Sequence, residues 1–133
     1  MKYLLDTHVF LWSLFDTSKL SKSVKDIMLN ENNDLFVSSI SFWEISLKYS
    51  IGKLKLENVK PDELPLYAEK SGFEILNFDE LTAAAFYKLP CLDHFNPFDR
   101  MIIWQSINSD MIIISKDEKF KEYIQHGVRL FWS

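Results

Sequence analysis

Short apolar runs alternate with longer amphipathic segments along most of this chain. Runs of this kind are typical of buried strands, and they fall at Tyr3–Leu5, 35–38, Phe73–Phe78 and 111–114, with an edge strand expected at 128–132. Apolar spacing and capping residues predict helices over 8–15, 22–31, 42–51, 61–71, 80–88, 98–108 and 118–125. Strand–helix alternation without a tight hairpin signal predicts βαβ units, hence an α/β fold with a parallel sheet covered by helices on both faces.

Local signals mark several of the helix ends. Gly52 follows the helix at 42–51 as a C-terminal stop. Pro61 is followed by two acids, which is typical of a helix start, although Pro65 does not suit the interior of that helix. Asn96-Pro97 precedes the helix at 98–108 in the order of a cap and a first helical residue.

The composition suits a single globular domain over residues 1–133. The hydrophobic fraction is 47%, enough for a core. Cys91 is the single cysteine, which excludes an internal disulfide and suits a reducing cytoplasm. Asp6 and His8 interrupt the apolar stretch after Lys2, and no small-residue cleavage pattern follows. We therefore expect a cytoplasmic protein with no targeting signal and no membrane span.

Carboxylates follow two of the apolar runs directly. The first run ends at Asp6, and the run MIIIS leads into Lys116 and Asp117. In parallel sheets, ligands bind beyond the carboxyl ends of the strands. The pattern thus predicts that Asp6 and Asp117 point into one crevice.

Each candidate acid also has an ordinary structural interpretation. Asp6 and Asp117 are good helix caps. Asp99 follows Asn96 by three positions, as in a regular helix start, and Arg100 is a potential ion partner. These interpretations stay open beside a role in binding or catalysis.

Glu44 has two competing interpretations. Ser41-x-x-Glu44 fits a capping box, in which the glutamate reaches back to the cap's amide. However, Glu44 stands among Phe42, Trp43 and Ile45, on an apolar helix face where a charge is costly unless it is paired or coordinated.

Taken as a set, these acids favour a metal site. Carboxylates gathered at one end of a sheet repel one another, and a divalent cation removes that conflict. Oxygen-only ligation favours Mg²⁺, with Mn²⁺ as an alternative. The chain has no CxxC or HExxH motif, and His8, His94 and His126 are scattered, so a zinc site is not expected.

The net charge of −4 at first argues against a nucleic-acid partner. Asp6, Glu44, Asp99 and Asp117 account for all of it, so the remaining charges balance. Residues 48–60 carry four lysines against one acid, and this stretch is either a solvated loop or a rim that contacts phosphates. The candidate substrate contacts are Lys48, Arg100 and Lys116, with Lys119 as a further cation.

Four stretches carry a resemblance to a known family. They are LLDTH (4–8), SSISFWEI (38–45), NPFDRMIIWQS (96–106) and ISKDEKF (114–120). In this order and spacing they resemble PIN-domain ribonucleases, specifically the VapC-type toxins of type II toxin–antitoxin systems. The resemblance spans nearly the whole chain, and it implies a three-layer α/β/α sandwich with a central parallel sheet.

The resemblance also implies functional residues. The family's acidic metal-site positions, which are its catalytic positions, fall on Asp6, Glu44, Asp99 and Asp117. Its two hydroxyls beside the acids fall on Thr7 and Ser115, and the arginine of its PFDR signature is Arg100. One departure is Asn96, where relatives often carry an acid, and we place it at the helix cap. The implied activity is Mg²⁺- or Mn²⁺-dependent endoribonuclease hydrolysis by water that the metal activates.

The resemblance implies partners as well: an RNA substrate, a cognate antitoxin and a second copy in a homodimer. Phe10, Trp12, Phe15, Phe42 and Trp43 are expected to be mostly buried, with some lining a groove for an antitoxin helix. Two rival functions are a phosphoacceptor receiver domain, which Ser38 at the end of the second strand disfavours, and a non-catalytic PIN-like RNA-binding module.

Overall fold

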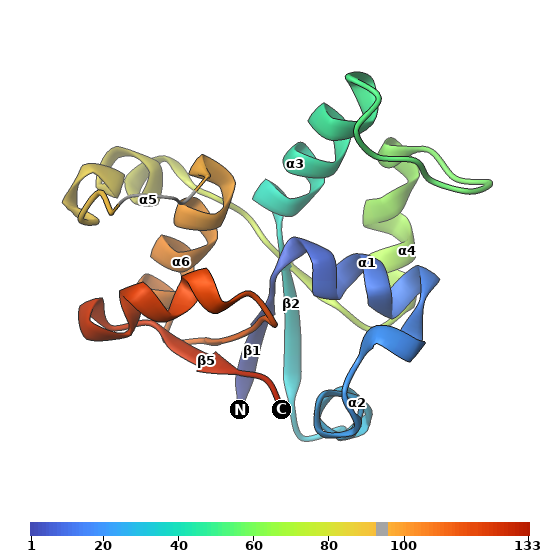
Figure 1. The fold of residues 1–133 in the computed structure, drawn as a ribbon, viewed down its shortest axis with the longest axis horizontal. Coiled ribbons are helices and arrows are strands. Elements are labelled where there is room, and N and C mark those ends of the chain that lie inside the picture. Colours follow the sequence, from blue (N-terminus) through green and yellow to red (C-terminus); the bar gives the residue numbers. More distant parts are fainter. Residues whose placement is uncertain (93–95) are drawn as a thin grey trace.

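The computed structural model describes residues 1–92 and 96–133, and it places helices on both faces of one parallel sheet (Figure 1). The strands are β1 (Lys2–Leu5), β2 (Asp34–Ser38), β3 (Glu74–Leu76), β4 (Ile112–Ile114) and β5 (Arg129–Phe131). Every neighbouring pair is parallel, and the order across the sheet is β3-β2-β1-β4-β5. The predicted α/β/α architecture is confirmed, and so is an edge strand near the C-terminus.

The helices lie close to their predicted positions. They are α1 (Thr7–Phe15), α2 (Lys22–Leu29), α3 (Ser39–Ser50), α4 (Leu64–Lys70), α5 (Glu80–Ala84) and α6 (Pro97–Ser109). Four 3₁₀ segments accompany them in the described residues: η1 (Thr17–Lys19), η2 (Pro61–Glu63), η3 (Phe86–Lys88) and η4 (Glu118–His126).

Four helix predictions need correction. The helix predicted at 80–88 is α-helical only over Glu80–Ala84, and η3 follows it as a separate 3₁₀ segment. The helix predicted at 42–51 already begins at Ser39. The segment 61–71 is divided into η2 and α4, because Pro65 has no N–H and fits only the first turn of an α-helix. The predicted last helix is the 3₁₀-helix η4 rather than an α-helix.

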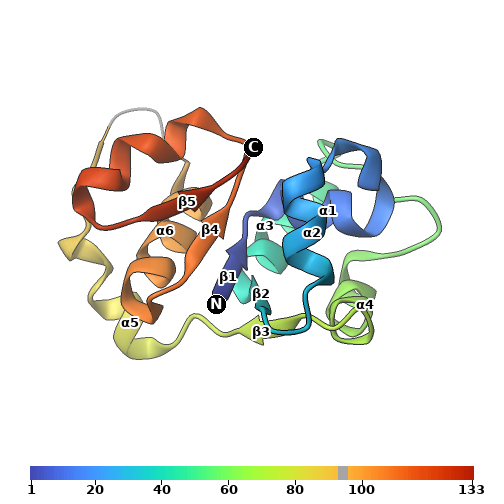
Figure 2. The ribbon, with the colours of Figure 1, turned by 90° about the horizontal axis from the view of Figure 1, so that it is seen from below.

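The central strands are buried on both faces, which explains their continuous apolar runs. Leu5 and Ile114 pack with residues of α1, α2 and α4 in one core cluster. Leu4 and Ile113 point to the other face and pack with residues of α6 and η4. Figure 2 shows the two groups of helices on opposite sides of the strands. Each fully buried leucine contributes about 1.5–3 kcal/mol to folding, so β1 anchors both layers.

The topology creates a switch point beside β1. From β1 the chain moves to β2 and β3 on one side, and it later returns to β4 and β5 on the other. Just past the ends of these strands, the Asp6 amide donates to the Ile114 carbonyl at 3.1 Å. Helix α3 lies beyond the ends of the strands and contacts both α1 and α6 (Figure 1). Open α/β sheets bind ligands at such a point.

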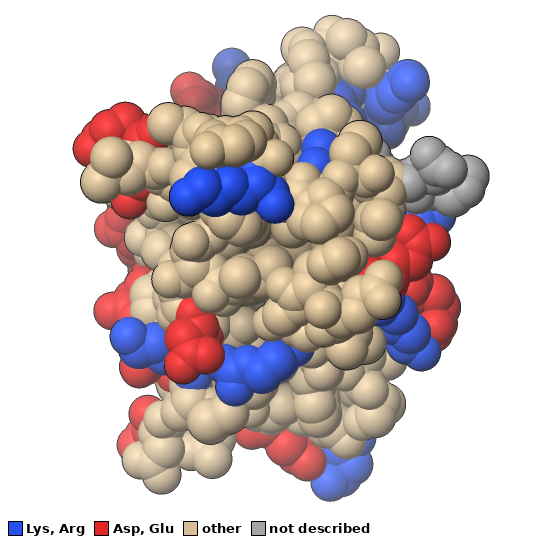
Figure 3. All heavy atoms as spheres, turned by 90° about the vertical axis from the view of Figure 1, so that its left-hand side faces the viewer, with Lys and Arg blue, Asp and Glu red and all other residues tan. Residues whose placement is uncertain are grey.

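The surface on the side of α5 and α6 is mixed in charge. Figure 3 shows acidic and basic side chains scattered over a mainly uncharged face. This face therefore has no single-sign field to steer a nucleic acid. Separately, none of the helices in the described ranges has the length and apolar character needed to cross a membrane.

Candidate active site

Asp6 lies at the centre of the site, between the end of β1 and the start of α1. Its side chain caps α1, with Oδ1 accepting from the Val9 amide at 2.8 Å, and its Oδ2 accepts from the Ser115 hydroxyl at 2.5 Å. The residue is only 5% exposed. Burial raises the pKa of Asp6, the two hydrogen bonds oppose that rise, and the nearby charge of Asp117 adds to it. Both oxygens are therefore held in a fixed orientation.

Ser115 connects Asp6 to the segment after β4. Its hydroxyl oxygen donates to Asp6 and accepts from the Asp117 amide at 3.0 Å. Asp117 in turn caps η4 by accepting from the Lys119 amide at 2.9 Å, and its side chain is exposed. The structure thus brings Asp6 and Asp117 to the same end of the sheet, as the sequence pattern predicts.

Glu44 is buried in the second turn of α3. Its Oε2 accepts from the Lys48 ammonium at 2.6 Å, an ion pair across one helical turn. Its Oε1 is buried and has no hydrogen-bond partner among the described residues. A buried carboxylate oxygen without a donor is costly, and in native proteins it commonly marks a site that a water or an ion occupies.

The capping-box interpretation of Glu44 is wrong, because α3 begins three residues before Phe42. Ser38 caps the helix by accepting from the Ile40 amide at 3.0 Å. The Ser41 hydroxyl oxygen instead accepts from the Thr7 hydroxyl at 2.9 Å, which ties α3 to α1. Thr7 therefore positions the helix that carries Glu44.

Asp99 lies in the first turn of α6. Asn96 caps this helix by accepting from the Asp99 amide at 2.8 Å, which confirms the predicted cap. Burial is the largest of the causes that raise the pKa of Asp99 to about 7, and the charges of Glu44, Asp6 and Asp117 contribute to the same rise, in that order. These effects require the four carboxylates to lie within electrostatic reach of one another.

Arg100 does not pair with Asp99. Its guanidinium donates to the Tyr123 hydroxyl at 3.2 Å and to the Leu89 carbonyl at 3.1 Å, and it lies 4.8 Å from the centroid of the Phe86 ring. The expected ion pair is therefore wrong, and the structure gives Arg100 a structural role that joins α6 to η3 and η4. A substrate contact by Arg100 stays a prediction.

We expect Arg100→Met to lower the free energy of unfolding by about 1–3 kcal/mol, because it removes the hydrogen bonds that the guanidinium donates to the Leu89 carbonyl and the Tyr123 hydroxyl. Urea unfolding of the metal-free protein measures this loss. Lys116→Met is the control, since Lys116 is exposed and should shift stability by less than about 0.5 kcal/mol. Unchanged stability with weakened RNA binding would instead make Arg100 a substrate contact.

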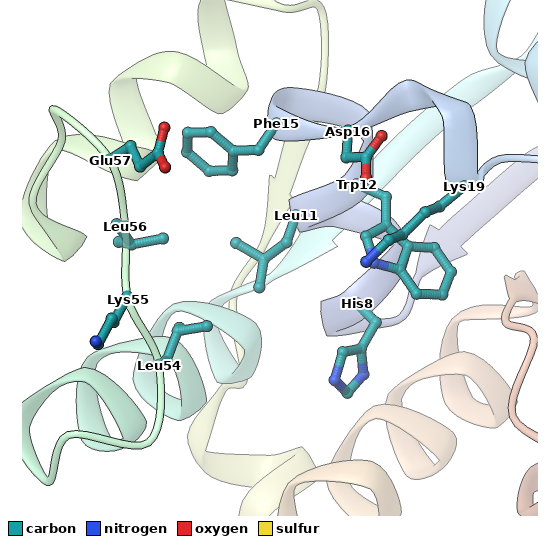
Figure 4. A pocket seen from close by; sticks show the side chains of 10 residues that line it. All are labelled: His8, Leu11, Trp12, Phe15, Asp16, Lys19, Leu54, Lys55, Leu56 and Glu57. Atoms are coloured by element: carbon teal, nitrogen blue, oxygen red, sulfur yellow. The ribbon is translucent and has the colours of Figure 1, made fainter.

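Two hollows share His8 and Trp12 in their lining, and Asp6 lines one of them. One has a volume of about 520 Å³ and is lined by Asp6, His8, Trp12, Lys116, Asp117, Glu118 and Lys119. The other, about 410 Å³, lies between α1 and the segment 54–57, where side chains from both face one another (Figure 4). His8 and Trp12 line both hollows, so the acidic end of the sheet continues into an apolar groove with charged edges.

The sequence interpretation missed His8 as a site residue. It is exposed, it follows Asp6 by two positions, and its charge lowers the pKa of Asp6. Its position in the first turn of α1, just after the end of β1, was the sequence feature that could have identified it. His94 lies outside the described residues, and His126 is in η4.

The expectation that the five aromatic residues named from the sequence are mostly buried is wrong, because only Phe10 is buried, whereas the expectation that some of them line a groove agrees with the structure. Phe10 is fully buried and Phe42 is half-buried against it, whereas Trp12 and Phe15 line the groove in Figure 4. Trp43 is exposed and packs edge-on against Phe98 with ring centroids 5.5 Å apart.

The donor chemistry of the site fits a hard cation, although the side chains do not surround one. Within residues 1–92 and 96–133, no three His, Cys, Asp or Glu side chains are arranged to hold a metal ion. Protein donors occupy three of the acids instead: Ser115 on Asp6, Lys48 on Glu44 and the Lys119 amide on Asp117. The unpartnered Glu44 Oε1 and the mutual repulsion at Asp99 are the features that a divalent cation would relieve.

Comparison with known proteins places this chain in a family. No curated protein matches the chain. Among solved structures, VapBC2 from Rickettsia felis bound to a promoter DNA fragment matches with 20% identity and a TM-score of 0.73, covering 100% of both chains. DNA-bound VapBC from Salmonella typhimurium has 19% identity and a TM-score of 0.66, covering 98% of this chain and 97% of that one.

VapBC-5 from Mycobacterium tuberculosis, a member of the VapBC family of toxin–antitoxin systems, has 15% identity and a TM-score of 0.62, covering 99% of this chain and 98% of that one. At these identities the structural matches show a shared fold. The sequence itself matches the PIN domain family over residues 3–124, which includes all four candidate carboxylates. The chain belongs to the PIN domain family.

Proposed function

We propose that this protein is a VapC-type toxin, a divalent-metal-dependent endoribonuclease that hydrolyses phosphodiester bonds in RNA. The observation that carries the proposal is the set of acids at the carboxyl end of a PIN-domain sheet: Asp6 after β1, Glu44 in α3, Asp99 in α6 and Asp117 after β4. The raised pKa of Asp99, to which the charges of the other three acids contribute after burial, supports this grouping. Repelling carboxylates beside an open hollow suit a metal-assisted reaction on an anionic substrate.

In this proposal, Asp6, Glu44 and Asp99 hold Mg²⁺ or Mn²⁺, directly or through water, and Asp117 completes the site or orients the attacking water. The bound ion would lower the pKa of a water molecule and offset the negative charge of the phosphate. Ser115 keeps Asp6 oriented, and Thr7 fixes α3 through Ser41. Lys116 and Lys119, on the wall of the hollow, supply positive charge for RNA phosphates.

Two protein partners belong to the proposal. An antitoxin fits the groove in Figure 4, where Leu11, Phe15, Leu54 and Leu56 offer an apolar lining between charged edges. A second copy of the chain fits the exposed apolar side chains of α3 and its end, which are Trp43, Leu47, Tyr49 and Ile51. The VapBC-5 match comes from a toxin–antitoxin family, which supports the first of these partners.

The test is cleavage of total cellular RNA by the purified protein. We expect cleavage with Mg²⁺ or Mn²⁺, none with EDTA, and a large loss in Asp99→Asn. Asp99→Asn leaves the cap of α6 intact, because Asn96 bonds the backbone amide of residue 99 and not its side chain. Loss of cleavage in this variant would therefore reflect the missing carboxylate.

The rival is a PIN-like module that binds RNA without cleaving it. It predicts RNA binding that is unchanged in Asp6→Asn and Asp99→Asn, with no cleavage at any Mg²⁺ or Mn²⁺ concentration, and that result would overturn the proposal. The receiver-domain alternative is wrong, because the sequence matches the PIN domain family.

A further inference from the structure

Lys48 and Glu44 form an ion pair unlike an ordinary surface pair. Lys22 and Asp26 are also four residues apart on a helix, and the Lys22 Nζ lies 3.2 Å from the Asp26 Oδ2. Their side chains are 90% and 62% exposed, as is usual for a surface pair. In the second pair, the Lys48 Nζ and the Glu44 Oε2 are 2.6 Å apart. The Lys48 side chain is 35% exposed and the Glu44 side chain only 2%. The carboxylate of Glu44 is therefore removed from water, and Lys48 reaches it from the surface.

A buried carboxylate needs a positive partner, because its desolvation is otherwise uncompensated. Lys48 supplies one partner at Oε2, while Oε1 lacks any donor in the described part of the chain. The charge of Lys48 also lowers the pKa of Asp99, so the ammonium lies near a second acid of the cluster. It thus occupies the position where a cation would offset both carboxylates.

The lysine can leave this position. Its side chain is partly exposed, and its ammonium ends a flexible four-carbon stem that can move into solvent. A small divalent cation with carboxylate and water ligands carries twice the charge of the ammonium group. It can therefore replace Lys48 as the positive partner of Glu44. Lysine and metal would then alternate at one carboxylate, so that Glu44 has a positive partner in both states.

We propose that Lys48 is an internal counter-ion that holds Glu44 in the metal-free protein and that binding of a divalent cation displaces its ammonium group from Glu44. This inference rests on the metal site of the proposed function. It assigns Lys48 a positioning role in the metal-free state, in addition to any contact with RNA phosphates.

The first test measures Mn²⁺ affinity directly, without RNA. Wild-type protein freed of metal by EDTA and dialysis is titrated with Mn²⁺ in a calorimeter, beside Lys48→Met, Lys48→Arg and the matched control Lys22→Met. Removing a competing cation should tighten Mn²⁺ binding by about 5-fold or more, at the lower end of typical coupling between two ligands. Lys48→Arg should stay near wild type, and so should Lys22→Met.

Thermal melting gives the second readout. In EDTA, Lys48→Met should melt about 5 °C or more below wild type, because Glu44 is left buried without a partner. In saturating Mn²⁺ this difference should disappear or change sign, since the ion replaces the lysine. A constant deficit in both conditions would assign Lys48 a purely structural role and would overturn the inference.

The third readout uses the unaltered protein. An amine-reactive ester followed by peptide mass mapping reports how free each lysine is. Mn²⁺ should raise the labelling of Lys48 several-fold and leave Lys22 unchanged. If wild type binds Mn²⁺ while Lys48 labelling and the variants' affinities stay constant, the inference fails and the metal site stands. If wild type binds no Mn²⁺, both fail.

Discussion

Asp6→Asn should lower RNA cleavage on the order of 10³-fold while the protein stays folded, a loss comparable to removing a preorganised charge from a transition state. The substitution removes the negative charge from the centre of the acidic cluster. Asparagine is as good a helix cap as aspartate, so its oxygen can still accept from the Val9 amide. Because the pKa of Asp6 is raised by burial, losing the charge should not destabilise the metal-free protein.

Cleavage rates with saturating Mg²⁺ and circular dichroism of the same samples test this expectation. The matched control is Asp79→Asn, because Asp79 also caps a helix, accepting from the Thr82 amide at 2.7 Å, but lies outside the acidic cluster and is exposed. It should cleave RNA at the wild-type rate. Cleavage by Asp6→Asn within a few-fold of wild type would remove Asp6 from the catalytic residues.

The metal-free protein should lose stability as the pH rises from about 5 to about 8. Burial and the charges of Glu44, Asp6 and Asp117 raise the pKa of Asp99 from 3.8 to about 7. A carboxyl whose pKa is higher in the folded state binds its proton more tightly there. Its contribution to stability is therefore fully present below the unfolded pKa and is lost as the pH rises through about 7.

The size of this effect follows from the shift. One pKa unit corresponds to about 1.4 kcal/mol, so the loss should be on the order of a few kcal/mol. Urea unfolding in EDTA at about pH 5 and about pH 8 measures it. Asp99→Asn should flatten the dependence, and Mg²⁺ should restore stability at the higher pH, because a bound cation favours the ionised cluster.

Asp79→Asn again serves as the control. Hydrogen bonds from the backbone and the side chain of Thr82 lower the pKa of Asp79, so this exposed residue titrates below the tested range. The variant should keep the wild-type slope between the two pH values. A metal-free wild type that is equally stable at both values would mean that the carboxylates are not coupled as the structure places them.

Local sequence patterns were enough to predict the parallel sheet and the positions of Asp6 and Asp117. The apolar runs at 3–5 and 111–114 are strands because both of their faces are buried, and the carboxylates that follow them must lie where parallel strands end. Asn96 likewise caps α6 through a contact within one turn, and Pro97 is the first residue of that helix. Interactions of this range are encoded by neighbouring residues, so spacing along the chain predicts them.

Interactions between distant segments were not predictable in this way. The motif Ser41-x-x-Glu44 has the spacing of a capping box, but Ser41 bonds Thr7, 34 positions away, and the helix begins earlier. Arg100 stands next to Asp99 in sequence, yet its guanidinium contacts η3 and η4. Pro65 marked a break in the predicted helix without saying where the α-helix would begin.

The amino-acid sequence alone determined the order of strands and helices, the parallel sheet and the acids that follow its strands, because periodicity and caps act over a few residues. The tertiary structure decided which side chain each acid meets. Ser115 donates a hydrogen bond to Asp6, and the charges of three acids lie near Asp99. One oxygen of Glu44 accepts from Lys48, and the other has no partner among the described residues. Burial and charge depend on how distant segments pack, and they give these carboxylates their chemistry.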